Sequence, residues 1–397
     1  MGVSPLHKLV FLRFLFLASS SRYGIKATLA FSPSVPLTSF KDEISSDTSF
    51  SNRNRMLSCL SASFGSLGCR PIGIGSSVPP TIITNADLEA VVETTDEWIS
   101  TRTGIRQRHV LVGSDESLQQ LGAIAGKQAL EMANIQPEDI DLVLCATSTP
   151  DDLFGDATSI AAKLGCKNAF GFDLTAACSG FLFGIVTAGQ FLTNGSMKNV
   201  LVVGADSLSR WVDWDDRNSC ILFGDGAGAV VLTQDHESPG VLGYAAHSNG
   251  LGHDDLKLSY CGSPRLVATP GDGTMLSKGS YDAVSMNGRE VYKFATREVP
   301  KVLLESLDAA GMTVDDIDWL LLHQANIRIM EAVASRLGIP MEKVIANLSD
   351  YGNTSAASIP LALDEAVRSG KVKPGDVIAC AGFGAGLSWG AAILKWG

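Results

Sequence analysis

The chain has 397 residues, of which 45% are hydrophobic and 18% charged, and it contains 40 glycines and 8 cysteines. This composition supports a large folded core and excludes a disordered or collagen-like chain. The net charge of −11 argues against nucleic-acid binding through the overall field, and no apolar run approaches the length that inserts stably into a membrane.

Residues 1–64 differ in composition from the rest of the chain. They contain seven Lys and Arg against three acidic residues, and 14 serines, whereas residues 65–397 carry 24 basic and 39 acidic residues. A basic, Ser-rich and acid-poor N-terminal segment is typical of an organelle transit peptide. A secretory signal is the alternative, because Lys8 precedes the apolar run 9–18, although Arg13 interrupts that run. We predict a transit peptide over residues 1–64 and location in the plastid stroma.

Beyond the leader, apolar strands alternate with helical stretches, which is typical of an α/β fold. Three pairs of segments share their order of apolar and acidic residues, the first two at a shift of 177 residues: 130–144 with 307–321, 200–204 with 377–381, and 228–232 with 390–394. Chance similarity of two α/β segments is the alternative for any one pair. We predict an internal duplication, with one half at 65–235 and the other at 236–397.

Cys178 is the first candidate reactive group. It lies between an expected strand at 169–174 and an apolar stretch of helical length that begins at Phe181. The backbone N–H groups at a helix N-terminus favour a thiolate over a thiol, so this position indicates a nucleophile. A small buried cysteine is the alternative. We prefer that alternative for four other cysteines: Cys145, Cys166, Cys220 and Cys380.

Two further polar residues are expected close to Cys178. His323 directly ends an expected buried strand at 319–322, and catalytic groups gather at the carboxyl ends of strands in such sheets. Asn353 lies in the Gly/Asn/Ser-rich turn 351–358, near the position that Cys178 holds in the first half. The duplication therefore places Cys, His and Asn on neighbouring loops. A capping or core histidine and an ordinary Asn turn are the alternatives.

The glycine-rich segments 223–229 and 382–386 lack the spacing of dinucleotide-binding and phosphate-binding loops. They predict tight turns where the backbone approaches a buried site closely. No paired-ligand spacing or Cys-x-x-Cys pair occurs along the chain, so we expect neither a metal nor a cofactor.

Basic residues recur at helical spacing in the second half. Arg289, Lys293 and Arg297 fall every four residues on one expected helix face, and Arg328 and Arg336 follow His323. A solvated charged face is one interpretation. A docking site for an acidic partner is the other.

Several of these segments together resemble the β-ketoacyl-acyl carrier protein synthase III family. The resemblance covers about residues 68–397 and rests on five runs in the same order: 95–106, 176–181, 223–229, 323–326 and 352–358. It implies a thiolase-like fold, an internally duplicated layered α-β-α-β-α architecture that agrees with the repeat. The leader lies outside the resemblance and indicates the plant plastid form.

The resemblance also implies a reaction, the decarboxylative condensation of acetyl-CoA with malonyl-acyl carrier protein. Cys178 would take the acetyl group as a thioester. The side chains of His323 and Asn353 would donate hydrogen bonds to the malonyl thioester carbonyl as enolate charge develops. The backbone N–H groups of Cys178 and Ala385 would hold the tetrahedral oxyanion, although many relatives have glycine at the position of Ala385.

Substrate contacts are implied residue by residue. Trp98 and Arg217 would sandwich the adenine of CoA, and Arg102 would contact the phosphate region. Phe154 matches a loop that crosses a homodimer interface and closes the partner's acyl pocket. A basic carrier-docking patch is implied at three positions: Lys293, Arg328 and Arg336.

Two other classes share the order Cys, His, Asn. Type III polyketide synthases have it but lack the run 98–106, and papain-like cysteine proteases have it in a different context. The proteases would require a Cys-Trp pair, disulfides and a secretory leader. Ser179 follows Cys178 here, so the synthase interpretation is preferred.

Overall fold

The computed structural model describes residues 62–113, 116–266 and 275–397. The predicted leader lies outside these ranges except for its last three residues. Those form β1 (Ala62–Phe64), which pairs antiparallel with β9 (Val241–Ser248). The boundary at residue 64 stays a prediction. Within the described ranges, no helix has the length and apolar character needed to cross a membrane.

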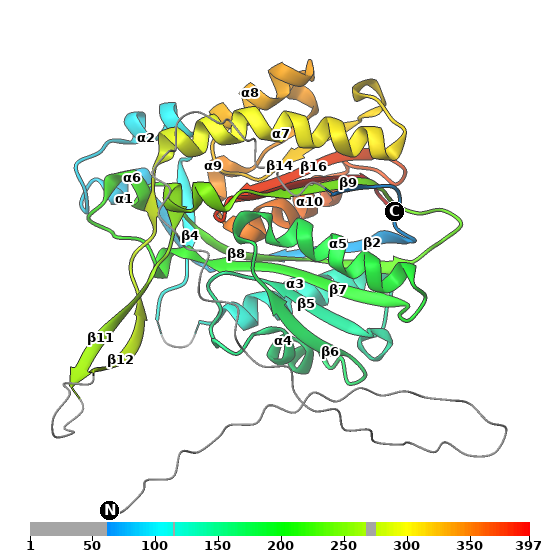
Figure 1. Cartoon of the computed structure of the whole chain (residues 1–397), viewed down its shortest axis with the longest axis horizontal. Coiled ribbons are helices and arrows are strands. Elements are labelled where there is room, and N and C mark those ends of the chain that lie inside the picture. Colours follow the sequence, from blue (N-terminus) through cyan, green and yellow to red (C-terminus); the bar gives the residue numbers. More distant parts are fainter. Residues whose placement is uncertain (1–61, 114–115, 267–274) are drawn as a thin grey trace, which may run out of the picture. The chain divides into compact units, whose positions relative to one another are not determined.

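Two mixed β-sheets form the centre of the fold (Figure 1). The first contains, in spatial order, β2 (Cys69–Ser77), β8 (Asp225–Gln234), β7 (Asn199–Ser207), β5 (Leu142–Ala146) and β6 (Phe170–Leu174). The second contains β1, β9, β17 (Ser388–Lys395), β16 (Val377–Gly384), β14 (Trp319–Leu322) and β15 (Val344–Ile345).

The two sheets repeat one topology. The order β2-β8-β7-β5-β6 corresponds strand for strand to β9-β17-β16-β14-β15. In both sheets the strand next to the edge strand (β5 or β14) runs parallel to its two neighbours, and the remaining pairs are antiparallel. The predicted internally duplicated α/β fold is therefore confirmed. The division at residues 235 and 236 stays a prediction.

Helices fill three layers around the sheets (Figure 1). α3 (Leu118–Ala133) and α4 (Ala157–Leu164) cover the outer face of the first sheet, and α7 (Gly288–Ala310) and α8 (Ile327–Leu337) cover the second. Between the sheets lie α5 (Gly180–Thr193) and α10 (Ser358–Arg368). α5 is apolar around most of its circumference because both sheets pack against it, with Phe181 and Leu182 fully buried.

Short elements complete the described ranges. They include β3 (Thr81–Thr84), α1 (Asn85–Leu88), α2 (Asp96–Thr103), β4 (Gln107–Val110), α6 (Arg217–Cys220), β10 (Leu256–Lys257), β11 (Tyr260–Leu266), β12 (Met275–Tyr281), β13 (Ser285–Met286) and α9 (Leu348–Tyr351). The 3-10 turns are η1 (Pro137–Asp139), η2 (Ala177–Ser179), η3 (Leu208–Arg210), η4 (Gly250–Asp255), η5 (Val314–Asp316), η6 (Met341–Lys343) and η7 (Ser355–Ala357). η2 and η7 immediately precede α5 and α10 and contact each other.

Candidate active site

The contact between η2 and η7 brings corresponding positions of the two halves together. Cys178 lies in η2 directly before α5, the location expected from the sequence. Its Sγ lies 3.4 Å from Oγ of Ser355, the residue 177 positions further along the chain. Ala177 and Ser355 have φ values of 47° and 49°. Left-handed backbone at residues other than glycine is costly and clusters at functional sites, which supports a functional role for both turns.

The surroundings of Cys178 oppose ionisation. The side chain is almost completely buried, and this burial raises the pKa of the thiol to about 12, against the lowering effect of the Ser355 hydrogen bond. The charge of Asp206 raises that pKa further. The helix N-terminus alone would lower the pKa of the thiol, but desolvation raises that pKa by more, because two sheets enclose the turn. The raised pKa favours the thiol, so removal of its proton becomes part of the reaction.

His323 follows β14 and is buried. Its Nδ1 lies 2.7 Å from Oγ of Ser358, and the Gln324 N–H donates to that same oxygen. The Ser358 hydroxyl can then donate to Nδ1, which places the ring hydrogen on Nε2. Burial lowers the pKa of His323 to about 3. The histidine is therefore a neutral N–H donor rather than a cation.

Backbone hydrogen bonds on both sides hold Asn353 in place. Its N–H donates to Leu222 O at 2.8 Å, and its carbonyl accepts from Gly224 N at 3.0 Å. The side-chain Oδ1 accepts from Ser355 N at 2.9 Å. Because Oδ1 is occupied, the amide presents its Nδ2 hydrogens to a ligand. Among the described residues, no acceptor for Nδ2 is found.

The three predicted catalytic side chains line one cavity of about 710 Å³. Gly384, at the end of β16, lines the same cavity. A Cβ at this glycine would lie 2.8 Å from Cys178 N and 3.1 Å from Cys178 Cβ. The backbone at Gly384 thus packs directly against the Cys178 turn, as the glycine content of this segment predicts. Ala385 follows Gly384 and is half-buried.

The residues that the family resemblance assigns to CoA binding lie at or near the same cavity. Trp98 and Arg102 of α2 line it. Cζ of Arg102 lies 4.4 Å from the Trp98 ring centroid, and Cζ of Arg217, at the start of α6, lies 4.6 Å from the same centroid. Arg217 does not line the cavity, but it contacts the Trp98 indole, which does. An aromatic ring beside two guanidinium groups suits a planar base and its phosphates.

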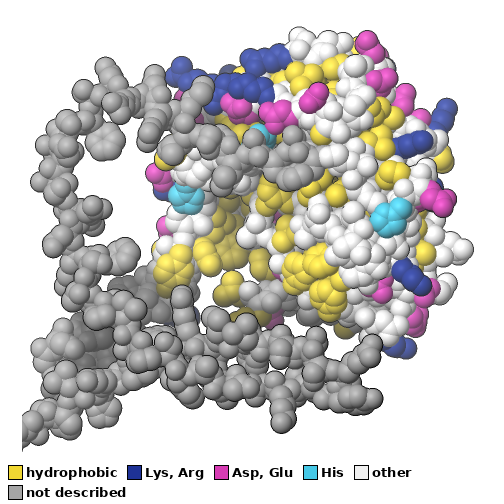
Figure 2. All heavy atoms as spheres, turned by 45° about the vertical axis from the view of Figure 1, so that its right-hand side comes forward, with side chains coloured by type: hydrophobic (Ala, Val, Ile, Leu, Met, Phe, Trp, Pro, Cys, Tyr) yellow, Lys and Arg dark blue, Asp and Glu magenta, His cyan; other side chains and the backbone are white. Residues whose placement is uncertain are grey.

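The predicted docking residues differ in their contacts. Arg328 is exposed, lines the cavity and donates to Thr101 O at 2.8 Å. Lys293 forms a 2.6 Å ion pair with Glu290, and Arg336 donates to the carbonyl of Thr296 on α7. Figure 2 shows Lys and Arg side chains gathered near the top of the visible face, with acidic side chains between them. Of the three docking candidates, Arg328 is the one that lines the cavity of Cys178, His323 and Asn353.

Phe154 lies away from this cavity within the chain. Its side chain is 100% exposed, the neighbouring Leu153 is 78% exposed, and both line a separate hollow of about 470 Å³ near β6. β6 is an edge strand of the first sheet and carries the exposed Phe170. A role for Phe154 in an acyl pocket therefore requires a second copy of the chain.

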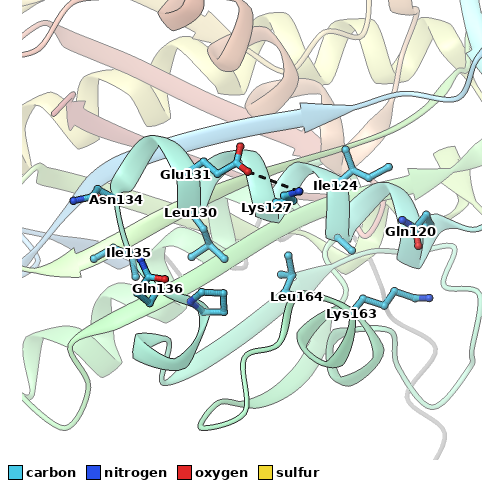
Figure 3. Close-up of a pocket in the computed structure, with 12 residues that line it drawn as sticks. Gln120, Ile124, Lys127, Leu130, Glu131, Asn134, Ile135, Gln136, Lys163 and Leu164 are labelled. Carbon is cyan, nitrogen blue, oxygen red and sulfur yellow. Dashed lines mark ion pairs between the residues drawn. The ribbon is translucent and has the colours of Figure 1, made fainter.

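A larger hollow of about 810 Å³ lies between α3 and α4 (Figure 3) and contains none of the predicted site residues. Its charged groups are Lys127, Glu131 and Lys163, and the first two form an ion pair at 3.9 Å. In the described part of the chain, no cluster of three or more His, Cys, Asp or Glu suits a metal ion. The predicted catalytic residues therefore lie in the Cys178 cavity and not in this hollow.

Sequence reasoning did not single out three polar residues around the site. Ser355 and Ser358 contact Cys178 and His323, but within a Ser-rich turn neither position differs visibly from its neighbours. Asp206 is completely buried in β7. An acidic residue in a largely apolar strand is the signal that could have indicated it.

A duplicated layered fold with a buried cysteine, a neutral histidine and an Asn amide in one cavity defines a thiolase-like condensing enzyme. The family described as 3-Oxoacyl-[acyl-carrier-protein (ACP)] synthase III matches residues 172–250, and its C-terminal counterpart matches residues 307–396. The chain belongs to the β-ketoacyl-[acyl-carrier-protein] synthase III family. This membership confirms the predicted resemblance, and it replaces the cysteine protease and type III polyketide synthase alternatives as the assignment of the chain.

Individual relatives support this assignment over most of the chain. The β-ketoacyl-[acyl-carrier-protein] synthase III of Acaryochloris marina is 58% identical over 330 residues, which are 83% of this chain and 98% of the relative. The chloroplastic enzyme of Arabidopsis thaliana is 55% identical over 336 residues, 83% of each chain. The crystal structure of 3-oxoacyl-[acyl-carrier-protein] synthase III from Aquifex aeolicus is 42% identical, with a TM-score of 0.74, and covers 83% of this chain and 100% of its own.

Proposed function

We propose that this chain joins the acetyl group of acetyl-CoA to malonyl-acyl carrier protein, releasing CO₂ and CoA and forming acetoacetyl-acyl carrier protein. The observation that carries the proposal is the shared cavity of Cys178, His323 and Asn353. Membership in the synthase III family supports the reaction class, an acyl transfer with carbon–carbon bond formation.

In the first half-reaction, Cys178 Sγ attacks the thioester carbonyl of acetyl-CoA. A bond forms between Sγ and the acetyl carbon, the carbon–sulfur bond to CoA breaks, and the CoA sulfur ends as a thiol. The tetrahedral oxyanion would accept hydrogen bonds from the backbone N–H groups of Cys178 and Ala385. The close packing of Gly384 on the Cys178 turn supports this pairing.

In the second half-reaction, malonyl-acyl carrier protein loses CO₂. The electron pair of the broken carbon–carbon bond becomes an enolate, whose oxygen accepts hydrogen bonds from Nε2 of His323 and Nδ2 of Asn353. A neutral donor suits this role because no proton has to move as the charge develops. The carbanion then attacks the acetyl group on Cys178, and the departing thiolate takes up a proton.

Each substrate would use its own part of the cavity mouth. Trp98 and Arg217 would hold the adenine of CoA, and Arg102 its phosphates. The proximity of both guanidinium groups to the Trp98 ring supports these roles, and Arg217 would move off the ring to admit the base. Carrier protein is acidic and would dock on Lys293, Arg328 and Arg336. Such charge complementarity chiefly raises the association rate.

We also propose a homodimer located in the plastid stroma. The fully exposed Phe154 beside edge strand β6 supports burial by a second copy that completes its acyl pocket. The chloroplastic Arabidopsis relative and the basic, Ser-rich composition of residues 1–64 support plastid import.

The test is the complete reaction with purified protein, acetyl-CoA and malonyl-acyl carrier protein, followed by mass analysis of the carrier. The parent protein should form acetoacetyl-carrier protein. His323→Ala and Asn353→Ala should lose decarboxylation while retaining some acetylation of Cys178. Equal loss of both half-reactions in a folded Asn353→Ala protein would contradict the assigned roles, and the absence of product from the parent would refute the function.

A further inference from the structure

A buried carboxylate lies behind the Cys178 turn, and the chemistry above does not use it. Asp206 of β7 is completely buried, which raises the pKa of its carboxyl. One oxygen accepts from Ser148 N and Thr149 Oγ1, both at 2.8 Å, and from Thr147 Oγ1 at 3.2 Å. The other accepts from Ala356 N of η7 at 3.1 Å. Asp206 is therefore fixed against the turn that contacts Cys178.

The hydroxyl of Ser355 connects Cys178 to this carboxylate. Its Oγ lies 3.4 Å from Sγ. The Ser355 side chain also interacts with the Asp206 carboxyl and lowers its pKa, and the next residue, Ala356, donates its N–H to that carboxyl. A hydroxyl has a single hydrogen to donate. When that hydrogen goes to the carboxylate, the oxygen accepts the thiol hydrogen of Cys178. These groups form a Cys178–Ser355–Asp206 chain.

Electrostatics favours moving one proton along this chain. A thiolate beside an ionised Asp206 would place two negative charges in one buried region, and the Asp206 charge already disfavours the thiolate. Protonating Asp206 as Cys178 reacts leaves a single negative charge there. Ser355 has a φ of 49°, a costly left-handed conformation for a residue other than glycine.

We propose that Ser355 relays the thiol proton of Cys178 to Asp206 during acetyl transfer. The Sγ–H bond breaks as the Sγ–acetyl bond forms, Ser355 Oγ takes that proton, and the Ser355 hydrogen moves to the carboxylate. CoA leaves as a thiolate and is protonated by water. After condensation, Asp206 returns its proton through Ser355 to the thiolate of Cys178. This inference rests on the proposed acetylation of Cys178.

The first test compares Ser355→Ala with Ser355→Gly. Both remove the hydroxyl, but glycine accepts a positive φ without strain, so a defect common to both is due to the hydroxyl. The Ser355 N–H still holds Asn353 Oδ1 in both variants. We expect acetylation by acetyl-CoA to slow by about 10²-fold or more, while malonyl decarboxylation changes little. Ser306→Ala removes a buried hydroxyl on α7 and serves as the control.

A pH profile separates this role from a structural one. Alkylation of Cys178 by iodoacetamide should titrate at higher pH in the Ser355 variants than in the parent, because Ser355 lowers the pKa of the thiol. Six other ionisable side chains in the described ranges share the cavity or face the turn, and they are unchanged in these variants: Asp206, His323, Arg102, Arg289, Tyr292 and Arg328.

Asp206→Asn distinguishes a proton acceptor from a bystander charge. If Asp206 accepts the proton, this variant acetylates more slowly. If its charge only opposes the thiolate, the variant acetylates faster. Faster acetylation by Asp206→Asn, or parent-like acetylation by both Ser355 variants, would overturn the relay. An unacetylated parent protein would refute the proposed function instead.

Discussion

The contact between Gly384 and the Cys178 turn provides a sharp test of how the nucleophile is held. Gly384→Ala adds one Cβ, which would lie 2.8 Å from Cys178 N, 3.1 Å from Cys178 Cβ and 3.3 Å from Ala177 Cβ. All three atoms belong to η2: one is a backbone nitrogen, and the other two are Cβ atoms bonded directly to the backbone. The overlap can therefore be relieved only by separating the Cys178 turn from the end of β16 that carries residue 384.

The expected magnitude follows from this overlap. Extra atoms in a packed interior typically cost about 1–3 kcal/mol, and a displacement of about 1 Å at a reacting group can cost about 10²-fold in rate. A shift of a few tenths of an ångström should therefore slow acetylation of Cys178 by roughly tenfold. The decarboxylation half-reaction should suffer less, because the three atoms nearest to the added Cβ belong to Ala177 and Cys178 and not to His323 or Asn353.

The assay measures the rate of acetylation by acetyl-CoA and the melting temperature for Gly384→Ala and for Gly250→Ala. A Cβ at Gly250 would meet no atom within 4 Å, so this control should match the parent in both. A folded Gly384→Ala protein that acetylates at the parent rate would refute the reasoning that this backbone contact positions Cys178.

Three further outcomes are expected. Burial lowers the pKa of folded His323 from 6.5 to about 3, so the stabilising contribution of neutral His323 is complete above pH 6.5 and is lost as the pH falls toward 3. The free energy of unfolding should therefore decline less steeply with acid in His323→Gln than in the parent. Equal slopes in the two proteins would contradict this. Reversing Lys293 and Arg328 to Glu should raise the KM for malonyl-acyl carrier protein and flatten the salt dependence of that KM, while acetylation changes little. If the KM is unchanged at two salt concentrations, these residues form only a solvated charged face and not a docking site. Trp98→Ala should raise the KM for acetyl-CoA without slowing malonyl decarboxylation, and a parent-like KM would count against stacking of the adenine on this ring.

Much of the fold could be predicted because the chain repeats itself. The shift of 177 residues found in the sequence is the offset between the starts of β5 and β14. Strong turn signals likewise marked Cys178, His323 and Asn353, which the structure brings to one cavity. These signals are local, so residue order and composition carry them.

The electrostatics of the site could not be predicted in the same way. The position of Cys178 before α5 indicated a lowered pKa, but burial by elements of both halves raises it. Contacts between Ser355 and Asp206 join η7 to β7, which are distant in the chain. Desolvation depends on how the layers close over the turn, and no local pattern records that.

Acetylation of Cys178 tests the central claim most directly. The parent protein and Cys178→Ala would each be incubated with acetyl-CoA alone, and the intact masses and peptides would then be measured. The account predicts one acetyl group on the parent, located on the peptide that contains Cys178, and none on the variant. An acetyl group elsewhere, or a Cys178→Ala protein that still transfers acetyl groups from CoA to carrier protein, would contradict it.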